Sequence, residues 1–166
     1  MEVFRGAALI AATITVGLAA GVFFAYANSV MPGLRRTDDR TFVGAFQAVD
    51  KAIVNPLFMA CLFGALVLAG LAAGLQINAD DSSVLPWAAA AFVLYLSAII
   101  ITVVVNVPLN NAIQAAGNPD HVDDLAAVRR QFNEAKWAAW NIVRALVSAA
   151  ALGCLAGSLV EYGALS

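Results

Sequence analysis

Long apolar stretches separated by short polar segments dominate this chain. They cover approximately residues 4–31, 53–75, 86–107 and 137–161. Each is close to the ~20 residues that a helix needs to cross the hydrocarbon core of a membrane. The pattern predicts an all-α, polytopic membrane four-helix bundle that forms a single domain over residues 1–166.

Two amphipathic segments precede the second and the fourth span. The first covers about residues 41–54, and the second covers about residues 119–136 and opens with Asn118-Pro119, typical of a cap and a first helical turn. A helix with one apolar face lies in the membrane interface or packs against other helices. We expect interfacial helices over both segments, and we expect the second to extend directly into the fourth span.

Prolines interrupt two of the spans near one end. Pro56 follows Asn55, so the second helix either kinks there or starts afresh with Asn55 as its cap. Pro108 disturbs the third span inside the motif Asn106-Val-Pro108-Leu-Asn110. Broken backbone at membrane depth is tolerated where it is buried in protein or lines a cavity.

The composition supports a membrane protein. Apolar residues make up 62% of the chain, charged residues make up 12%, and the mean hydropathy is +0.83. Soluble domains have roughly 45–50% apolar and 25% charged residues. The net charge of −2 and the lack of a long basic run argue against a nucleic-acid partner. Cys61 and Cys154 both lie in apolar runs, so we interpret them as small hydrophobic residues.

Basic residues gather on one side of the predicted bundle. The loops after the first and third spans, with their flanks, hold Arg35, Arg36, Arg40, Lys51, Arg129, Arg130 and Lys136. The opposite side holds Arg5 with several acids, among them Asp80 and Asp81. The positive-inside rule therefore predicts that both loops face the cytoplasm and that both termini lie outside it, in a bacterial inner membrane.

Small and polar residues divide the spans into two halves. The middle or outer half carries glycine pairs that permit close helix packing, namely Gly17/Gly21, Gly70/Gly74 and Gly153/Gly157. The inner half carries aromatic, amide and charged residues, namely Tyr26, Asn28, Gln47, Asp50, Asn55, Asn106, Asn110, Trp137, Trp140, Asn141 and Arg144. This pattern favours a pocket near the cytoplasmic face that is closed towards the outside. The alternative is a set of ordinary helix ends at the level of the lipid headgroups.

Arg144 is the most unusual of these residues. It follows Trp137, Trp140 and Asn141 at offsets that place all four side chains on one face of a helix. A guanidinium at membrane depth costs several kcal/mol unless it is paired or reaches water. On this helix alone, Arg144 can also be a residue that snorkels to the headgroups beside an aromatic belt of tryptophans. The short motifs that run through the rest of the chain favour the alternative, in which Arg144 points into the bundle. Its expected partners lie on the second and third spans, namely Asp50, Asn106 and Asn110.

Short motifs run through nearly the whole chain in a fixed order. They are Phe23-Phe-Ala-Tyr26, Val30-Met31-Pro32-Gly-Leu34, Phe46-Gln47, Asn55-Pro56-Leu-Phe58, Asn106-Val-Pro108-Leu-Asn110 and Trp137…Trp140-Asn141…Arg144. Together they resemble the anthrone-oxygenase-like membrane family, long catalogued as a domain of unknown function. Asp50 departs from the asparagine that we expect at this place in the family. The resemblance implies the bundle fold and, from members linked to polyketide pathways, oxidation of anthrones to anthraquinones without metal or flavin.

The sequence offers few ligands for a redox cofactor. The only histidine, His121, lies in a polar segment beside several aspartates, and we interpret this segment as a capped helix start. Haem, copper and non-haem iron sites usually need histidine or cysteine ligands. No glycine-rich strand–turn–helix for a dinucleotide is present. If the protein is an oxygenase, we expect a reaction without metal or other cofactor, because a deprotonated anthrone supplies its own electrons.

Three functions fit these features. The first is an oxygenase-like enzyme for a flat, hydrophobic phenol or quinol. Its expected site comprises Asp50 as base, oxyanion donors Arg144, Asn106, Asn110 and Asn141, stacking walls Trp137 and Trp140, and further contacts Tyr26 and Gln47. The second is a non-catalytic membrane protein that binds a lipid or quinone. The third is a structural membrane subunit, and assembly into a homo-oligomer is open in all three.

The predicted orientation is testable by labelling. Single cysteines at positions 38 and 82, introduced as Asp38→Cys and Ser82→Cys without Cys61 and Cys154, report which side of the membrane each loop faces. We expect a membrane-impermeant maleimide to label position 82 from the outside and position 38 from the cytoplasm, because seven basic residues oppose one. Labelling of position 82 from the cytoplasm alone would show that the orientation is reversed.

Overall fold

The chain is mostly helical over the part that a computed structural model describes, namely residues 1–77, 79 and 83–165. No strand occurs within these residues, which confirms the predicted all-α class. Asp80 and Asp81 of the predicted acidic loop lie outside the described residues.

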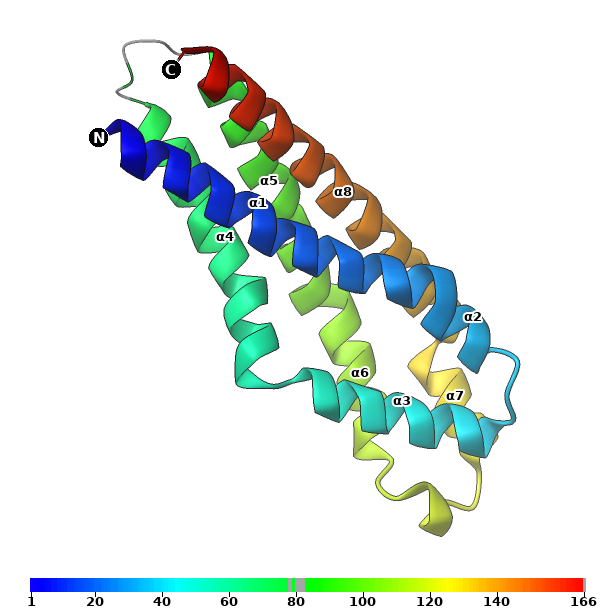
Figure 1. The fold of residues 1–166 in the computed structure, drawn as a ribbon. Coiled ribbons are helices and arrows are strands. Elements are labelled where there is room, and N and C mark those ends of the chain that lie inside the picture. Colours follow the sequence, from blue (N-terminus) through cyan, green and yellow to red (C-terminus); the bar gives the residue numbers. More distant parts are fainter. Residues whose placement is uncertain (78, 80–82, 166) are drawn as a thin grey trace.

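Four helical rods form the bundle, and each is long and apolar enough to cross a membrane. This confirms an integral, multi-pass membrane protein, while the orientation and the bacterial inner membrane stay predictions. The rod at α1 packs against α4 and α8, and α5 also packs against α4 and α8. Both termini lie at one end (Figure 1). The rods are α1 (Glu2–Ala25) with η1 (Tyr26–Val30) and α2 (Met31–Leu34), α4 (Pro56–Gln76), α5 (Leu85–Ile101) with η2 (Thr102–Asn106) and α6 (Val107–Ala115), and α8 (Glu134–Leu165).

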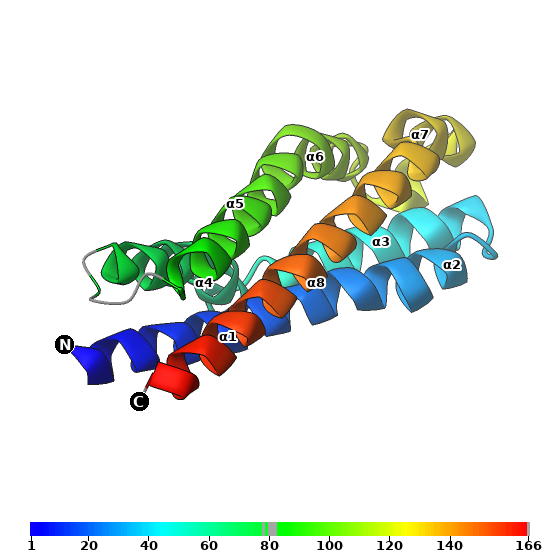
Figure 2. The same cartoon turned by 90° about the horizontal axis from the view of Figure 1, so that it is seen from above.

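Shorter helices cover the end of the bundle that is remote from the termini. They are α3 (Asp39–Ile53), the 3₁₀ turn η3 (Pro119–His121) and α7 (Leu125–Phe132). Figures 1 and 2 show α3 and α7 beyond the end of α4, beside the parts of the other rods that extend furthest from the termini. Aromatic side chains hold this layer together, because Phe46 packs 4.5 Å from Phe132 and 5.6 Å from Trp137, ring centre to ring centre.

The segment predicted as one helix over about 119–136 is divided instead. Asn118 caps only the short η3 turn, and Asp124 starts α7 by accepting the N–H of Ala127. Asn133 then adopts a left-handed backbone with φ of 53°, which ends α7 before α8 begins. Asparagine tolerates this conformation better than most residues, so a sharp turn separates α7 from the fourth rod.

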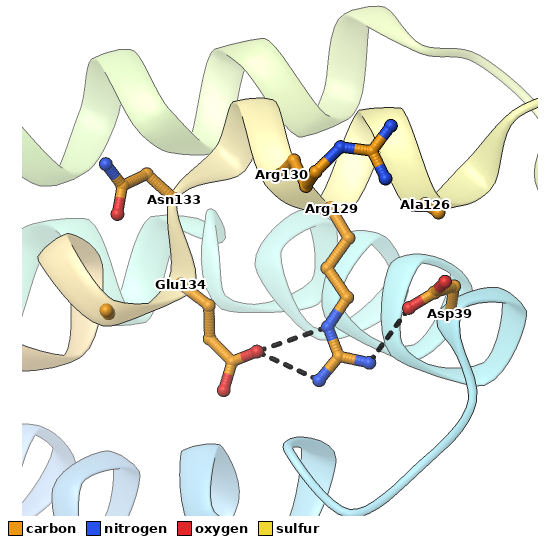
Figure 3. A pocket seen from close by; sticks show the side chains of 7 residues that line it. Asp39, Ala126, Arg129, Arg130, Asn133 and Glu134 are labelled. Atoms are coloured by element: carbon orange, nitrogen blue, oxygen red, sulfur yellow. Dashed lines mark hydrogen bonds and ion pairs between the residues drawn. The ribbon is translucent and has the colours of Figure 1, made fainter.

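Arg129 secures this turn (Figure 3). Its guanidinium donates to Glu134 at 2.9 and 3.2 Å, and to Asp39 at 3.1 Å. It also lies 4.2 Å from the ring centre of Phe42. One side chain therefore joins α7 to α8 and to α3. It fixes the layer formed by α3, η3 and α7, hereafter the covering layer, on the end of the bundle.

The prolines act in two different ways. Pro56 begins a separate helix, since the side chain of Asn55 accepts the Phe58 N–H at 2.9 Å. Pro32 and Pro108 leave their rods continuous, and each is preceded by a π-helical turn. The residue before each proline closes the turn: the N–H of Met31 donates to the carbonyl of Tyr26, and the N–H of Val107 donates to the carbonyl of Thr102, five residues back. The proline that follows has no N–H to continue the helical hydrogen bonds. The third span therefore runs on to Ala115, beyond the predicted end near residue 107.

Alanine does more of the close packing in the bundle than the predicted glycine pairs do. Fully buried alanines such as Ala12, Ala69 and Ala151 line the contacts between rods. Among the paired glycines, a Cβ on Gly157 would lie 2.9 Å from Trp87, whereas Gly153 has open space around it. The expectation of tight contact therefore fails for Gly153, as it does for Gly21 and Gly74, which also have open space.

These glycines make a matched pair for mutation. We expect Gly157→Ala to be less stable than Gly153→Ala by about 1–3 kcal/mol, because its new methyl group must displace Trp87. Gly153→Ala, one turn away on α8, should be neutral or stabilising, since alanine favours helix and meets nothing. Thermal unfolding in detergent measures both, and equal effects would contradict the packing described.

Candidate functional site

A cavity of about 350 Å³ opens inside the bundle, next to the covering layer. Residues from all four rods and from α3 line it, and most of the lining is apolar. Its polar lining residues are Tyr26, Asp50, Thr102, Asn110, Asn111, Asn141 and Arg144. The cavity therefore combines an apolar slot with a small set of polar groups, as ligand sites usually do.

Arg144 points into the bundle, as predicted. Its side chain is 5% exposed, Nη1 donates to Thr102 Oγ1 at 3.0 Å, and Nη2 donates to Asn141 Oδ1 at 2.8 Å. The guanidinium also lies 4.5 Å from the ring centre of Phe23. Its Nε is buried without a partner, and no carboxylate of the described residues lies within 4.0 Å. A buried cation without a counter-ion is costly, so Arg144 is the electrostatic centre of the cavity.

The prediction of which residues bind Arg144 is wrong. Asp50, Asn106 and Asn110 make no hydrogen bond or ion pair with it among the described residues. The guanidinium instead bonds to Thr102, which lies one turn deeper in its rod than Asn106. Depth along the bundle decides the pairing, because Arg144 itself lies about three turns inside its own rod, α8.

Asp50 anchors a second polar cluster in the same cavity. Asn110 Nδ2 donates to Asp50 Oδ1 at 2.7 Å, and Gln114 Nε2 donates to Asp50 Oδ2 at 2.9 Å. The indole N–H of Trp137 donates to Asn110 Oδ1 at 2.6 Å. A continuous chain of hydrogen bonds thus joins α3, α6 and α8, and each bond orients the next side chain.

The cavity walls near these clusters are aromatic. Tyr26 packs 5.7 Å from Trp137, ring centre to ring centre, and both side chains line the cavity. Phe23, Phe46 and Phe58 line it as well. Such walls suit a flat apolar ligand.

Two other predicted site residues support the fold and do not line the cavity. Gln47 is 5% exposed and donates to the carbonyls of Ile113 and Gly117, which lie at the end of α6. These bonds satisfy carbonyls that a helix end leaves unpaired. Asn106 is buried and donates to the Trp137 carbonyl at 3.3 Å, while its own Oδ1 has no partner. Both residues hold rods in place around the cavity.

Trp140 lies on the outer side of α8. It is 38% exposed and does not line the cavity, so its placement does not support the predicted stacking wall. The buried face of α8 repeats at alternating intervals of four and three residues, namely Trp137, Asn141, Arg144, Ser148, Ala151, Leu155 and Ser158. Trp140 falls between these positions and faces away from the core.

Thr102 and Gln114 are site residues that the sequence analysis did not select. Thr102 holds Arg144, and Gln114 holds Asp50. The third rod carries a polar residue at every fourth position, so Thr102, Asn106, Asn110 and Gln114 share one face. Extending that face by one turn at each end would have found both.

The part of the chain with described coordinates contains no cluster of three His, Cys, Asp or Glu side chains that could hold a metal ion. Cys61 and Cys154 are free thiols. The thiol of Cys61 lies 3.6 Å from the Thr15 carbonyl, consistent with a small residue packed between helices.

Comparison with known families decides the affiliation. A family model described as anthrone oxygenase matches residues 42–154, which is more than half of the chain. The chain belongs to the anthrone oxygenase family. The match includes both polar clusters of the cavity, from Asp50 to Arg144, and leaves Tyr26 and Phe23 outside. No curated protein and no solved structure matches the chain.

Membership in the anthrone oxygenase family makes the role of Arg144 testable. Replacing Arg144 with Met leaves the side-chain Oδ1 of Asn141 without its hydrogen-bond donor, which costs about 1–3 kcal/mol of stability. The same change removes a buried charge that costs several kcal/mol. We therefore expect Arg144→Met to unfold at the same or a higher temperature than the wild type while losing affinity for an anthrone.

Two further variants complete this test. Arg144→Lys keeps the charge but loses the planar fork, so we expect affinity to fall by about tenfold or more with little change in stability. Arg130→Met, at an exposed arginine of α7, is the control and should change neither property. A large loss of stability in Arg144→Met with ligand affinity retained would assign Arg144 a structural role. Calorimetry and thermal unfolding in detergent give both readouts.

Proposed function

We propose that the protein oxidises a flat, hydrophobic phenol, quinol or anthrone with molecular oxygen, without a cofactor, in the cavity between its rods. The observation that carries this proposal is the pair of opposite charges in one apolar cavity that do not pair with each other. Asp50 and Arg144 both line it, and each is held by its own neutral partners. A base and a cation in one slot are the groups that such a reaction needs.

Asp50 is the proposed base. Its carboxylate is held by Asn110 and Gln114, which come from a different rod and fix its direction at the cavity wall. In an anthrone the acidic proton lies on the ring carbon opposite the carbonyl. Its removal gives an enolate with negative charge on the oxygen. A base in fixed position contributes about 10²–10⁴-fold to such a proton transfer.

Arg144 is the proposed oxyanion donor. Two of its N–H groups hold Thr102 and Asn141, and a guanidinium has five N–H donors, so others are available for the enolate oxygen. Asn141 acts here through Arg144, which it orients. Trp137 and Phe23 supply apolar walls for the ring system. A fixed cation in an apolar slot stabilises developing negative charge far better than water does.

The redox step balances without a further reagent. The enolate transfers an electron to O₂, and the two radicals combine to give a peroxide anion on the deprotonated carbon. This anion takes back the proton held by Asp50 and becomes a hydroperoxide. Loss of one water from this hydroperoxide forms the second carbonyl. One anthrone and one O₂ thus give one anthraquinone and one H₂O, so the substrate is the reductant and oxygen is the oxidant.

A second function uses the same cavity without chemistry. A protein that binds a quinone or lipid would also need an apolar slot with polar groups at one end. The observation that favours it is that both oxygens of Asp50 already accept amide N–H groups. The third alternative, a purely structural role for the polar residues, does not explain why the bundle contains a cavity. Catalysis and binding differ in one measurable quantity, the consumption of oxygen.

Oxygen uptake by the purified protein in lipid nanodiscs tests the proposal. With anthrone as substrate, we expect one O₂ consumed per anthraquinone formed. Asp50→Asn should lower kcat by about 10²–10⁴-fold and change the Kd for anthrone much less, because it removes the base while the side chain keeps its size and loses only one of its two accepted hydrogen bonds. Asp123→Asn, at an exposed acid outside the cavity, is the control. Anthrone binding without oxygen uptake in the wild type would reject catalysis and favour the second function.

A further inference from the structure

The cavity has a mouth that opens through the side of the bundle. We propose that the substrate enters from the lipid bilayer through this mouth, polar edge first. It then belongs to the class of membrane-dissolved amphiphiles with one polar edge and an apolar remainder. This inference rests on the proposed function and adds the route and the substrate class to it. The mouth lies between the start of α4 and the segment from η2 to α6.

Exposed residues of the lining define the mouth. Five of them combine a place in the cavity wall with an outward-facing surface: Val54 is 63% exposed, Phe63 is 47%, Val103 is 53%, Val107 is 39%, and Asn111 is exposed as well. Four of the five side chains are apolar, and Asn111 is the one polar residue of this rim. In a protein that spans a membrane, such a rim meets lipid tails at little cost, whereas a water-facing entrance would have a polar rim.

The mouth lies within the membrane-crossing part of the rods. The helix α4 begins at Pro56 and is itself long enough to cross a membrane. Phe63 is seven residues further on, which corresponds to ~10 Å along the helix. Val103 belongs to the π turn of the third rod, and Val54 lies in the break between α3 and α4. Irregular backbone thus flanks the opening on both sides, as expected where a rod borders a cavity.

Polarity rises from the mouth to the closed end of the cavity. At the closed end Phe23, Trp137, Asn141 and Arg144 are each at most 5% exposed. The hydrogen-bonded groups of Arg144 and Asn141 are found there, while the rim carries mostly hydrocarbon. A ligand with one polar edge satisfies both ends only when that edge points inward. The gradient therefore fixes the orientation of the ligand as well as its route.

This route makes the membrane concentration of the substrate the quantity that sets the rate. Each added methylene group raises membrane partitioning by about fourfold. An alkyl substituent on an outer ring carbon, away from the carbonyl and from the carbon that loses its proton, would remain in the mouth or in the bilayer. We expect kcat/KM, expressed on total concentration, to rise along a series of alkylated anthrones. It should be nearly constant when expressed on mole fraction in the lipid.

A pair of neighbouring variants tests the mouth directly in phosphatidylcholine nanodiscs. Val103→Trp places a large side chain on the rim and should lower kcat/KM for anthrone by about tenfold or more, with kcat retained at saturation. Val104→Trp is the control, because Val104 is 66% exposed on the same turn but does not line the cavity. Val54→Trp, on the opposite rim, repeats the test if Val103→Trp does not fold. Equal activity of the 103, 54 and 104 variants would overturn the proposal.

A second measurement does not depend on catalysis. A nitroxide label at position 103, in a protein without Cys61 and Cys154, reports its collisions with dissolved oxygen and with a water-soluble nickel chelate. We expect oxygen collisions to dominate, because oxygen concentrates in hydrocarbon. Dominant nickel collisions would show a water-filled mouth and overturn the route. A bilayer-facing mouth in a protein that consumes no oxygen would reject the oxygenase function while supporting the same entry for a bound lipid or quinone.

Discussion

The buried guanidinium of Arg144, which has no ion-pair partner among the described residues, constrains the rest of this bundle. It is 5% exposed and has no carboxylate of the described residues within 4.0 Å. Burial of such a charge costs several kcal/mol. The hydrogen bonds that Arg144 donates to Thr102 and Asn141, and its contact with the ring of Phe23, offset only part of this cost. A fold that needed only stability would replace Arg144 with an apolar residue. The proposed ligand, which carries or develops negative charge, would account for the presence of Arg144.

The backbone around this charge is built to leave space. Regular α-helices packed by alanine form the half of the bundle near the termini. In the other half, π turns precede Pro32 and Pro108, and the chain breaks before Pro56. Each irregularity lies in or next to a segment that lines the cavity. The covering layer, fixed by Arg129, then lies across this end without filling it. Stability and site thus occupy different halves of the same four rods.

The sequence predicted the rods, the buried arginine and the polar end of the bundle, because those features follow from hydropathy and from spacing along one helix. It predicted less well what depends on contacts between helices. The partner of Arg144 on the third rod is decided by how deep each residue lies along the bundle. The spacing of residues within one span does not give their depth relative to residues of another span. Trp140 was misplaced because only the alternation of four and three residues along α8 separates it from Trp137. The turn at Asn133 depends on one left-handed residue and on Arg129, and neither gives a periodic signal.

The separation of Asp50 from Arg144 is the last feature that needs a physical explanation. Two opposite charges in one apolar cavity should attract strongly, and a direct ion pair would lower the cost of burying both. Each is instead held by neutral groups, Asp50 by Asn110 and Gln114, and Arg144 by Thr102 and Asn141. Three of these four partners come from the third rod, so one helix face holds the two charges apart. In the proposed reaction, the carboxylate and the guanidinium would act on opposite ends of one ligand, and a closed ion pair between them would exclude this.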